Sequence, residues 1–171
     1  MAKVASADVL LIEDSLEDAE LTIYALRGTC THITVDTFTS GEAALAHLTR
    51  AGSGVGGETG KPQLILLDYD VPGVDAKESL RTFKAHEALK SIPVVVLTSQ
   101  HDPNIIKQCY ELGANSVLCK AEQLRDYFLQ IQQLAKYWLL VNAAATAELD
   151  ESEALDGIPP TRWSRFNELR N

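Results

Sequence analysis

Short apolar runs that end in acidic residues constrain the fold of this chain more than any other feature of its sequence. Residues 9–12 form one such run and are followed by Glu13 and Asp14, and residues 64–67 form another that is followed by Asp68. Bounded apolar runs of this length are typical of strands that are buried in a parallel sheet. Polar residues that follow such strands lie where open α/β sheets bind their ligands. The pattern predicts a parallel sheet with an acidic site at one edge.

Strand and helix patterns alternate along the first 142 residues. Ser15, Ser40 and Asp102 stand where residues that cap helices are expected. Gly28 and Gly113 stand where helices are expected to end. The expected strands are 9–12, 32–38, 63–68, 92–98 and 115–119, and the expected helices are 16–27, 41–48, 75–89, 103–112 and 122–141. This alternation predicts an α/β fold, a doubly wound five-stranded parallel sheet with helices on both faces and right-handed crossovers.

Residues 1–142 are expected to form one domain, because the character of the sequence changes after them. Residues 143–171 begin as a small, acidic stretch and contain Pro159-Pro160. This region is too short for a second globular domain, so we expect an acidic linker and a short tail without a separate effector domain. Trp163, Phe166 and Leu169 recur in it at three-residue spacing. They suit either a docking helix for a kinase or target or the end of a disordered linker, and the sequence leaves both open.

Charge and hydropathy narrow the possible partners and compartments. The formal net charge is −9, which argues against sequence-independent binding to nucleic acid, because that binding needs Lys and Arg against phosphate. No apolar run approaches the roughly 20 residues that a membrane-spanning helix needs, and no signal peptide is recognisable at the N-terminus. The three cysteines form no metal-binding or CxxC pattern. A cytoplasmic protein with reduced cysteines is expected.

The ends of four expected strands carry the residues of one candidate site. Glu13 and Asp14 follow the first strand, Asp68 ends the third, Thr98 ends the fourth and Lys120 follows the fifth. Carboxylates a few ångströms apart repel one another, by about 4 kcal/mol for a pair at 4 Å with an effective dielectric constant near 20. Mg²⁺ would relieve this repulsion, since it prefers oxygen ligands and binds carboxylates together with a phosphate oxygen. We therefore expect a magnesium-dependent phosphoryl transfer in which Asp68 is the nucleophile.

With these residues in place, the chain resembles the receiver domains of two-component response regulators, which have the CheY-like, flavodoxin-like (βα)5 fold. The resemblance covers about residues 8–140. The matching segments are Leu11-Ile12-Glu13-Asp14-Ser15, Leu67-Asp68-Tyr69-Asp70-Val71-Pro72-Gly73, Val95-Val96-Leu97-Thr98-Ser99 and Gly113-Ala114-Asn115, which leads to Lys120.

The resemblance implies a role for each residue of the site. It implies that Asp68 accepts a phosphoryl group from a histidine kinase and that the protein signals through protein–protein contacts. Asp14 and Asp68 would bind Mg²⁺ together with the backbone carbonyl of Asp70 and, through water, Glu13. Thr98 and Lys120 would bind the phosphoryl group. A response regulator of this kind is a phosphoacceptor and not an enzyme with an external substrate.

Three positions depart from the pattern of the family. The family often has Gly where Ala76 stands, an aromatic residue at the place of Val117, and Pro, often after a cis bond, at the place of Ala121. A non-proline cis bond costs about 2.5–4 kcal/mol. These departures leave the chemistry of the site intact and put in question the family's usual switching route, in which an aromatic ring rotates inward behind Thr98.

A narrower resemblance concerns the single-domain regulators that are paired with phytochrome kinases. It rests on Tyr137-Trp138-Leu139 at the end of the last helix, on the glycine-rich loop at residues 51–60 and on the expected lack of an effector domain. It implies that the partner kinase is a bacteriophytochrome.

The last expected helix, residues 122–141, has apolar residues on two faces. One stripe, which we expect to face the sheet, consists of Leu124, Phe128, Ile131, Ala135 and Trp138. A helix that is apolar on two faces is usually buried on both. We therefore expect a homodimer through this helix, or a tail that folds back over it. The residues assigned to the homodimer interface are Tyr127, Leu134, Tyr137, Trp138 and Val141.

Two other functions fit part of the same pattern. The segment from Leu66 to Val71 also resembles the nucleophile motif of haloacid dehalogenase-type phosphatases, in which Asp70 would be a general acid. That motif normally opens its domain, and its acidic pair follows the Lys, whereas here Glu13 and Asp14 precede it. A receiver fold that binds partners without phosphorylation is the third possibility, and the presence of Asp68, Thr98 and Lys120 together argues against it.

Overall fold

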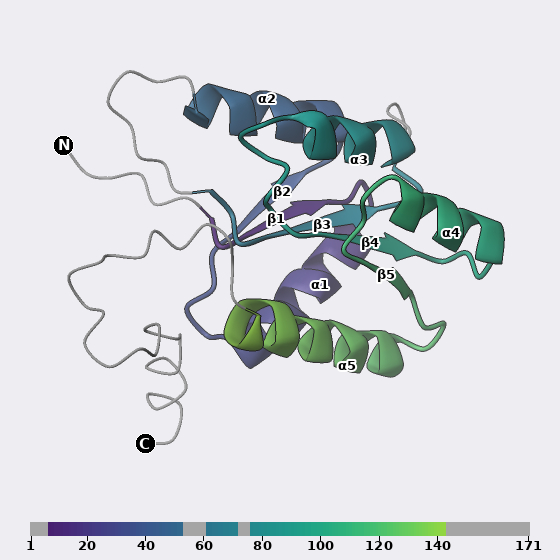
Figure 1. The fold of residues 1–171 in the computed structure, drawn as a ribbon. Helices are drawn as coiled ribbons and strands as arrows, with labels where there is room; N and C mark the ends of the chain where they lie inside the picture. The colour runs from purple at the N-terminus through teal and green to yellow at the C-terminus, as the bar shows by residue number, and fades with distance from the viewer. Residues whose placement is uncertain (1–6, 53–60, 72–75, 143–171) are drawn as a thin grey trace, which may run out of the picture.

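The computed structural model describes residues 7–52, 61–71 and 76–142, and the side chains of residues 50–52 lie outside this description. Its strands are β1 (Val9–Ile12), β2 (Val35–Phe38), β3 (Leu64–Asp68), β4 (Val94–Thr98) and β5 (Ser116–Cys119). Its helices are α1 (Leu16–Thr29), α2 (Gly41–Gly52), α3 (Ala76–Ala85), α4 (Pro103–Glu111) and α5 (Leu124–Ala135), which continues into a π-helix, η1 (Lys136–Val141). The strands form one parallel sheet in the order β2-β1-β3-β4-β5 (Figure 1). The predicted doubly wound five-stranded fold is confirmed.

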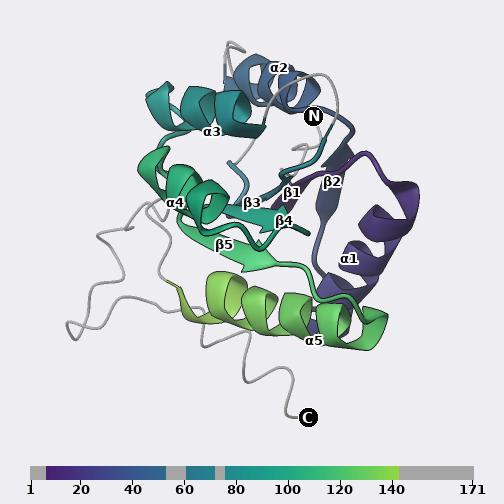
Figure 2. The same ribbon diagram turned by 90° about the vertical axis from the view of Figure 1, so that its right-hand side faces the viewer.

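Helices cover both faces of the sheet. Figures 1 and 2 show α1 and α5 on one face and α2, α3 and α4 on the other. Each face has its own apolar core, because alternate side chains of a strand point to opposite faces. Leu11 and Leu66 pack with α1 and α5, whereas Leu10 and Ile65 pack with α2, α3 and α4. The central strands β1, β3 and β4 are buried along their whole length, which explains their uninterrupted apolar sequences.

The register of the sheet brings the carboxyl ends of neighbouring strands level with one another. Ile12 pairs with Leu67, Asp68 pairs with Leu97, and Thr98 pairs with Cys119. Residues at these ends and just beyond them therefore lie along one edge, as the alternation of the sequence predicts.

All three predicted helix caps are visible in the structure, and Ser40 Oγ accepts a hydrogen bond from the backbone N–H of Ala43 at 3.2 Å. Ser15 Oγ accepts a hydrogen bond from the backbone N–H of Asp18 at 3.3 Å, and Asp102 Oδ1 accepts one from Asn104 at 2.8 Å. Such bonds satisfy backbone donors that have no partner within the helix. Gly113 follows α4 with a φ of 98°, a conformation that favours glycine. The prediction that Gly28 ends the first helix is wrong, because α1 continues to Thr29 and its cap is Cys30.

The longest predicted helix differs most from the structure. The sequence predicts one helix over residues 122–141, whereas α5 ends at Ala135 and a π-helix follows. Its wider turn is marked by a bond of 2.7 Å from the backbone N–H of Asn142 to the carbonyl of Tyr137, five residues earlier. The predicted apolar stripe assumes an α-helical period, so it no longer describes which residues share a face after Ala135. Leu124, at the other end of that stripe, is 71% exposed and does not face the sheet.

Two residues that were predicted to form a homodimer interface lie inside the protomer. Tyr127 is only 4% exposed, and its hydroxyl shares a hydrogen bond of 2.9 Å with Thr22 of α1. Leu134 is buried in the same core. For Tyr127 the prediction is wrong because α1 packs along α5 and covers this face of the helix, a contact that the pattern of the last helix alone does not reveal. Leu134 instead points toward β5 and lines the groove between that strand and the last helix.

The remaining helix and strand predictions need small changes at their ends. The second strand begins at Val35, not at residue 32, α2 continues to Gly52, and α3 ends at Ala85, well before residue 89. No peptide bond in the described residues is cis, so the bond between Lys120 and Ala121 is trans. No helix in the described part of the chain has the length and apolar character needed to cross a membrane. The predicted tail at 143–171 lies outside the described residues.

Candidate functional site

Three carboxylates meet at the carboxyl ends of β1 and β3. One ligand oxygen from each of Glu13, Asp14 and Asp68 lies within 4.8 Å of the others. Glu13 and Asp68 are each 4% exposed, whereas Asp14 is exposed. The predicted acidic cluster is therefore present, with two buried members and one that faces solvent.

Lys120 supplies the positive charge of the site. Its Nζ lies 3.0 Å from Glu13 Oε2, 2.9 Å from Asp18 Oδ2 and 3.2 Å from Asp68 Oδ1. The Lys120 side chain is 13% exposed, so these ion pairs are shielded from solvent. The ammonium is thus held between the acids of β1, α1 and β3, next to the residue proposed to react.

Asp18 is a residue of the site that sequence reasoning missed. The pattern marks it only as the third residue after the Ser15 cap, and its carboxylate turns out to bind Lys120, 102 residues away. Its place in the first turn of a helix that starts at the site edge of the sheet is the one signal in the sequence that could have identified it.

One oxygen of Asp68 has no hydrogen-bond partner. Asp68 Oδ1 is buried and forms no regular hydrogen bond, and it lies 3.2 Å from Lys120 Nζ in an ion pair. Buried polar atoms are rarely left without a partner, and the exceptions are often found at functional sites. This oxygen is therefore placed to bind a cation or to react.

Burial shifts the pKa of both inner carboxyl groups. Burial raises the pKa of Asp68, and the nearby charge of Lys120 offsets only part of that effect. The pKa of Glu13 is also raised, first by burial and then by the charge of Asp68. Burial by itself would lower the pKa of the Lys120 ammonium, but Asp18, Asp68 and Glu13 outweigh it and raise that pKa. The lysine therefore stays charged while the inner acids lack full compensation.

Thr98 and Asp70 take part in a second group of hydrogen bonds at the same edge. Thr98 is fully buried, and its Oγ1 accepts a bond of 3.0 Å from the backbone N–H of Gln100. The exposed Asp70 carboxylate accepts bonds from Ser99 Oγ at 3.2 Å and from Gln100 Nε2 at 2.8 Å. Asp70 therefore bonds to the residues after β4.

The sequence matches the family of response regulator receiver domains over residues 9–132. The chain is a response regulator receiver domain. It is 36% identical over 131 residues to response regulator Rcp1 of a Synechocystis strain. The aligned segment covers 77% of this chain and 88% of Rcp1. As a member of this family it belongs to two-component signalling.

Solved structures agree with this assignment. The receiver resembles the phosphorylated cyanobacterial phytochrome response regulator RcpA, with a TM-score of 0.74 and 30% identity over 82% of this chain and 99% of that one. It also resembles the Mn²⁺-bound form of Rcp1, with a TM-score of 0.71 and 34% identity over 81% and 98% of the two chains. The narrower resemblance to phytochrome-associated regulators is thus confirmed as a similarity of sequence and fold.

The family assignment decides against the phosphatase alternative, and the geometry agrees with it. A general acid at Asp70 would need its carboxylate free in the site, whereas Ser99 and Gln100 hold that carboxylate.

The acidic cluster of the receiver fits a divalent cation. Hard cations such as Mg²⁺ and Mn²⁺ prefer oxygen ligands, and the cluster offers three carboxylates and an oxygen of Asp68 without a hydrogen-bond partner. Burial raises the pKa of both Glu13 and Asp68 because it penalises their negative charge, and a bound cation would offset that penalty.

Two of the three departures from the family pattern, Val117 and Ala121, lie on either side of Lys120 in the chain. Val117 and Ala121 are half-buried and pack against the cores on opposite faces of the sheet. Gln130 of α5 accepts a bond of 3.0 Å from the backbone N–H of Ala121 and donates one of 3.1 Å to the carbonyl of Cys119. Gln130 therefore holds the chain on both sides of Lys120.

Proposed function

We propose that Asp68 accepts a phosphoryl group from the histidine kinase of a two-component system. The observation that supports it best is the buried Asp68 oxygen that lacks a hydrogen-bond partner and lies 3.2 Å from Lys120 Nζ. Attack by Asp68 on phosphorus forms an acyl phosphate and breaks the P–N bond of the kinase phosphohistidine, whose imidazole nitrogen keeps the electron pair. The protein then changes only its own phosphorylation state and turns over no other substrate.

Glu13, Asp14 and Asp68 are the proposed ligands of Mg²⁺, with the backbone carbonyl of Asp70 and with Glu13 acting through water. Once bound, the ion neutralises charge on the carboxylates and on the phosphoryl group. Lys120 pairs with a phosphoryl oxygen, and its existing bonds to Glu13 and Asp18 already hold it next to Asp68. The Thr98 hydroxyl donates a hydrogen bond to another phosphoryl oxygen.

The test is the intact mass of the protein after incubation with acetyl phosphate, with and without Mg²⁺. Wild type is expected to gain one phosphoryl group only with Mg²⁺, and Asp68→Asn is expected to gain none. Asp126→Asn, at an exposed position of α5, is the matched control and should behave as wild type. An adduct that persists in Asp68→Asn would refute the assignment of Asp68.

We propose that the partner kinase is a bacteriophytochrome and that the protein works in the cytoplasm. For the kinase, support comes from the similarity to phytochrome response regulators. For the compartment, it comes from a sequence whose cysteines are odd in number and show no disulfide framework. An autophosphorylated bacteriophytochrome should transfer phosphate to this chain at least about tenfold faster than a histidine kinase without a phytochrome module, a specificity of about 1.4 kcal/mol. Equal rates from the two kinases would contradict the proposal.

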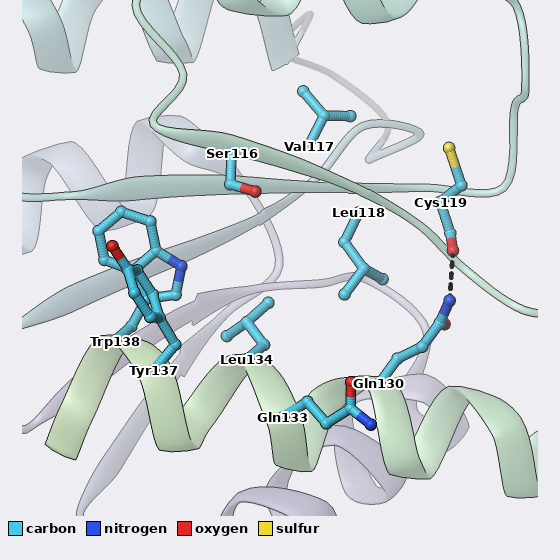
Figure 3. Close-up of a pocket in the computed structure, with 9 residues that line it drawn as sticks. All are labelled: Ser116, Val117, Leu118, Cys119, Gln130, Gln133, Leu134, Tyr137 and Trp138. Carbon is cyan, nitrogen blue, oxygen red and sulfur yellow. Dashed lines mark hydrogen bonds between the residues drawn. The ribbon is translucent and has the colours of Figure 1, made fainter. Parts of the chain in front are cut away.

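We also propose a homodimer through the end of the last helix, with its interface reduced to exposed residues. Tyr137 is 52% and Val141 63% exposed, and the half-buried Trp138 lies beside them. Figure 3 shows Tyr137 and Trp138 across from β5, and together they line an open groove of about 460 Å³. A symmetric pair of chains is the commonest way to cover such a surface.

The double variant Tyr137→Ser/Val141→Asp is expected to be monomeric by light scattering. Both side chains are exposed, so their loss should leave the fold intact. Tyr24→Ser, at a 71% exposed position of α1, is the control and should keep the dimer. A dimer that survives the double variant would exclude this interface.

A further inference from the structure

The side chain of Gln130 in α5 bridges the two residues that flank Lys120. Its Oε1 accepts a hydrogen bond of 3.0 Å from the backbone N–H of Ala121, and its Nε2 donates one of 3.1 Å to the carbonyl of Cys119. Figure 3 shows Gln130 reaching from α5 to this carbonyl. One side-chain amide therefore fixes the backbone both before and after Lys120.

The bond to Ala121 depends on a departure from the family pattern. Proline, the usual residue of the family at this place, has no N–H and could not donate to Gln130. Here the peptide bond between Lys120 and Ala121 is trans, and the Ala121 N–H is bonded to α5. The chain after Lys120 is thus fixed by a helix side chain and not by a proline ring.

The backbone of Lys120 is also held by β4. Its N–H donates to the carbonyl of Thr98 at 2.7 Å. Together with the two bonds from Gln130, this bond ties the segment from Cys119 to Ala121 to a strand on one side and to a helix on the other. The rotamers open to a side chain depend on its backbone conformation, so these bonds limit where the Lys120 ammonium can lie.

The place of the Lys120 ammonium matters because it is close to the residue proposed to react. Its Nζ lies 3.2 Å from Asp68 Oδ1 and 6.0 Å from the ring centre of Tyr127. Tyr127 and Gln130 are three residues apart in α5, so they are neighbours on one side of the helix. Helix α5 therefore contacts the side chain of Lys120 as well as the backbone around it. A misplacement of about 1 Å can slow a reaction step by as much as ~100-fold.

We propose that Gln130 is a positioning residue for phosphoryl transfer, because it holds the backbone on both sides of Lys120 and so sets the place of the ammonium beside Asp68. The inference rests on the proposed function of Asp68 and Lys120. It gives α5 a part in the reaction that the acidic cluster alone does not reveal.

The first test measures the rate of adduct formation from acetyl phosphate and the affinity for Mg²⁺ in Gln130→Leu. This substitution removes both hydrogen bonds and keeps most of the side-chain volume. The rate is expected to fall about three- to tenfold, the usual effect of losing a hydrogen bond. The affinity for Mg²⁺ should stay the same or increase, because the carboxylates remain and a displaced ammonium competes less with the cation for them.

Two further variants accompany this test. Gln133→Leu, at an exposed position of the same helix, is the matched control and should behave as wild type in both measurements. Gln130→Met keeps the length of the side chain without its amide, so it should repeat the result of Gln130→Leu.

The second test observes Lys120 directly by NMR. The resonance of its ammonium nitrogen is the one that Lys120→Met lacks. Gln130→Leu should shift this resonance in the protein without a phosphoryl group, and Gln133→Leu should leave it in place. A purely structural loss elsewhere in α5 would not move it.

The outcomes separate this inference from the proposed function. If wild type forms no adduct, the proposed function fails, and the role of Gln130 fails with it. If wild type forms the adduct and Gln130→Leu reacts equally fast, only the inference is wrong. It is also wrong if the slower reaction of Gln130→Leu comes with weaker Mg²⁺ binding or with an unchanged Lys120 resonance, because the variant would then act by damaging the site as a whole or without Lys120.

Discussion

At the scale of single residues, burial determines the behaviour of Asp68. The carboxylate lies at the end of a strand that is buried along its whole length, and burial raises its pKa even though Lys120 is close by. Part of the stability of the fold is therefore given up to keep a charged, reactive group in place, as is common at functional sites.

Asp68→Asn is expected to raise the melting temperature of the metal-free protein at pH 7 by about 2–4 °C, the shift that corresponds to roughly 1 kcal/mol for a chain of this size. The substitution removes a poorly compensated buried charge and keeps the shape of the side chain. In about 10 mM MgCl₂, wild type should instead melt at the higher temperature, because only wild type offers the full set of ligands. A concentration of about 10 mM fills a site of millimolar affinity. Thermal melts of both proteins, with Asp126→Asn as control, check this. A lower metal-free melting temperature for the variant would contradict the expectation.

The raised pKa of Asp68 also predicts that the stability of the protein depends on pH. The folded protein binds the Asp68 proton more tightly than the unfolded chain does, because the folded-state pKa lies above the usual value of 3.8. The cost of burying the charge is thus fully present above the folded-state pKa and disappears as the pH falls through it toward 3.8. Without Mg²⁺, the melting temperature of wild type relative to that of Asp68→Asn should therefore rise as the pH is lowered from 7. A difference that stays constant with pH would show that Asp68 is not the group responsible.

Gly113→Ala is expected to destabilise the protein by about 1–3 kcal/mol. Its φ of 98° disfavours any other residue, and a Cβ there would lie 2.9 Å from Lys84 Cγ. Lys84 cannot move away easily, because its Nζ donates to the carbonyl of Ile92 at 2.8 Å and to Asn115 Oδ1 at 2.7 Å. Urea denaturation measures the loss.

Gly28→Ala is the matched control for Gly113→Ala. Gly28 lies in α1, where alanine is favoured over glycine. Its added Cβ would meet the movable amide end of Gln132 at 3.0 Å and would lie 3.7 Å from Phe128 Cζ, an ordinary van der Waals contact. This variant should be as stable as wild type or more so. Equal losses at both glycines would show that backbone conformation is not the cause.

At the scale of elements, the contact between α1 and α5 explains why the last helix is apolar on two faces. One of these faces packs on the sheet and part of the other packs on α1, where the Tyr127 hydroxyl bonds to Thr22. The edge strand β5 is protected in a similar way, since Tyr110 Oη accepts from the backbone N–H of Val117 at 3.3 Å and Gln130 Nε2 donates to the carbonyl of Cys119. Side chains of α4 and α5 thus form hydrogen bonds with backbone groups of this edge strand.

Tyr127→Phe is expected to cost about 1–2 kcal/mol, because it leaves the buried Thr22 hydroxyl without its partner. The double variant Tyr127→Phe/Thr22→Val should recover most of this loss, since both ends of the bond then become apolar. Urea denaturation of wild type, the single variants and the double variant completes the cycle. Additive losses would mean that the two hydroxyls do not depend on each other.

At the scale of the whole molecule, the described fold is held together by two cores, one on each face of a single sheet. Both cores consist of described residues between 7 and 142, and the acidic cluster and Lys120 belong to the same region. We therefore expect a chain of residues 1–142 to melt within about 2 °C of the full chain, a difference below roughly 1 kcal/mol, and to form the same adduct with acetyl phosphate. A large loss of stability on removing residues 143–171 would show that this region packs on the domain.

The sequence by itself determined the fold class and the main residues of the site. Apolar runs of strand length, separated by helical segments, can satisfy their burial only as a parallel sheet, and residues that follow such strands must meet at its edge. The proximity of Glu13, Asp14, Asp68 and Lys120 was therefore predictable, as was the place of Thr98 at the same edge of the sheet. Helix ends were predicted where a cap is local, as at Ser15 and Asp102, and less well where packing decides the end, as at Gly28.

Only the tertiary structure decided which side chains complete the site and which apolar surface stays exposed. The bond from Lys120 to Asp18 and the bonds from Ser99 and Gln100 to Asp70 join residues far apart in the chain, and no local pattern specifies them. The burial of Tyr127 likewise depends on where α1 lies. Periodicity tells which faces of a helix are apolar, but the partner that covers each face is set by how all the elements pack together.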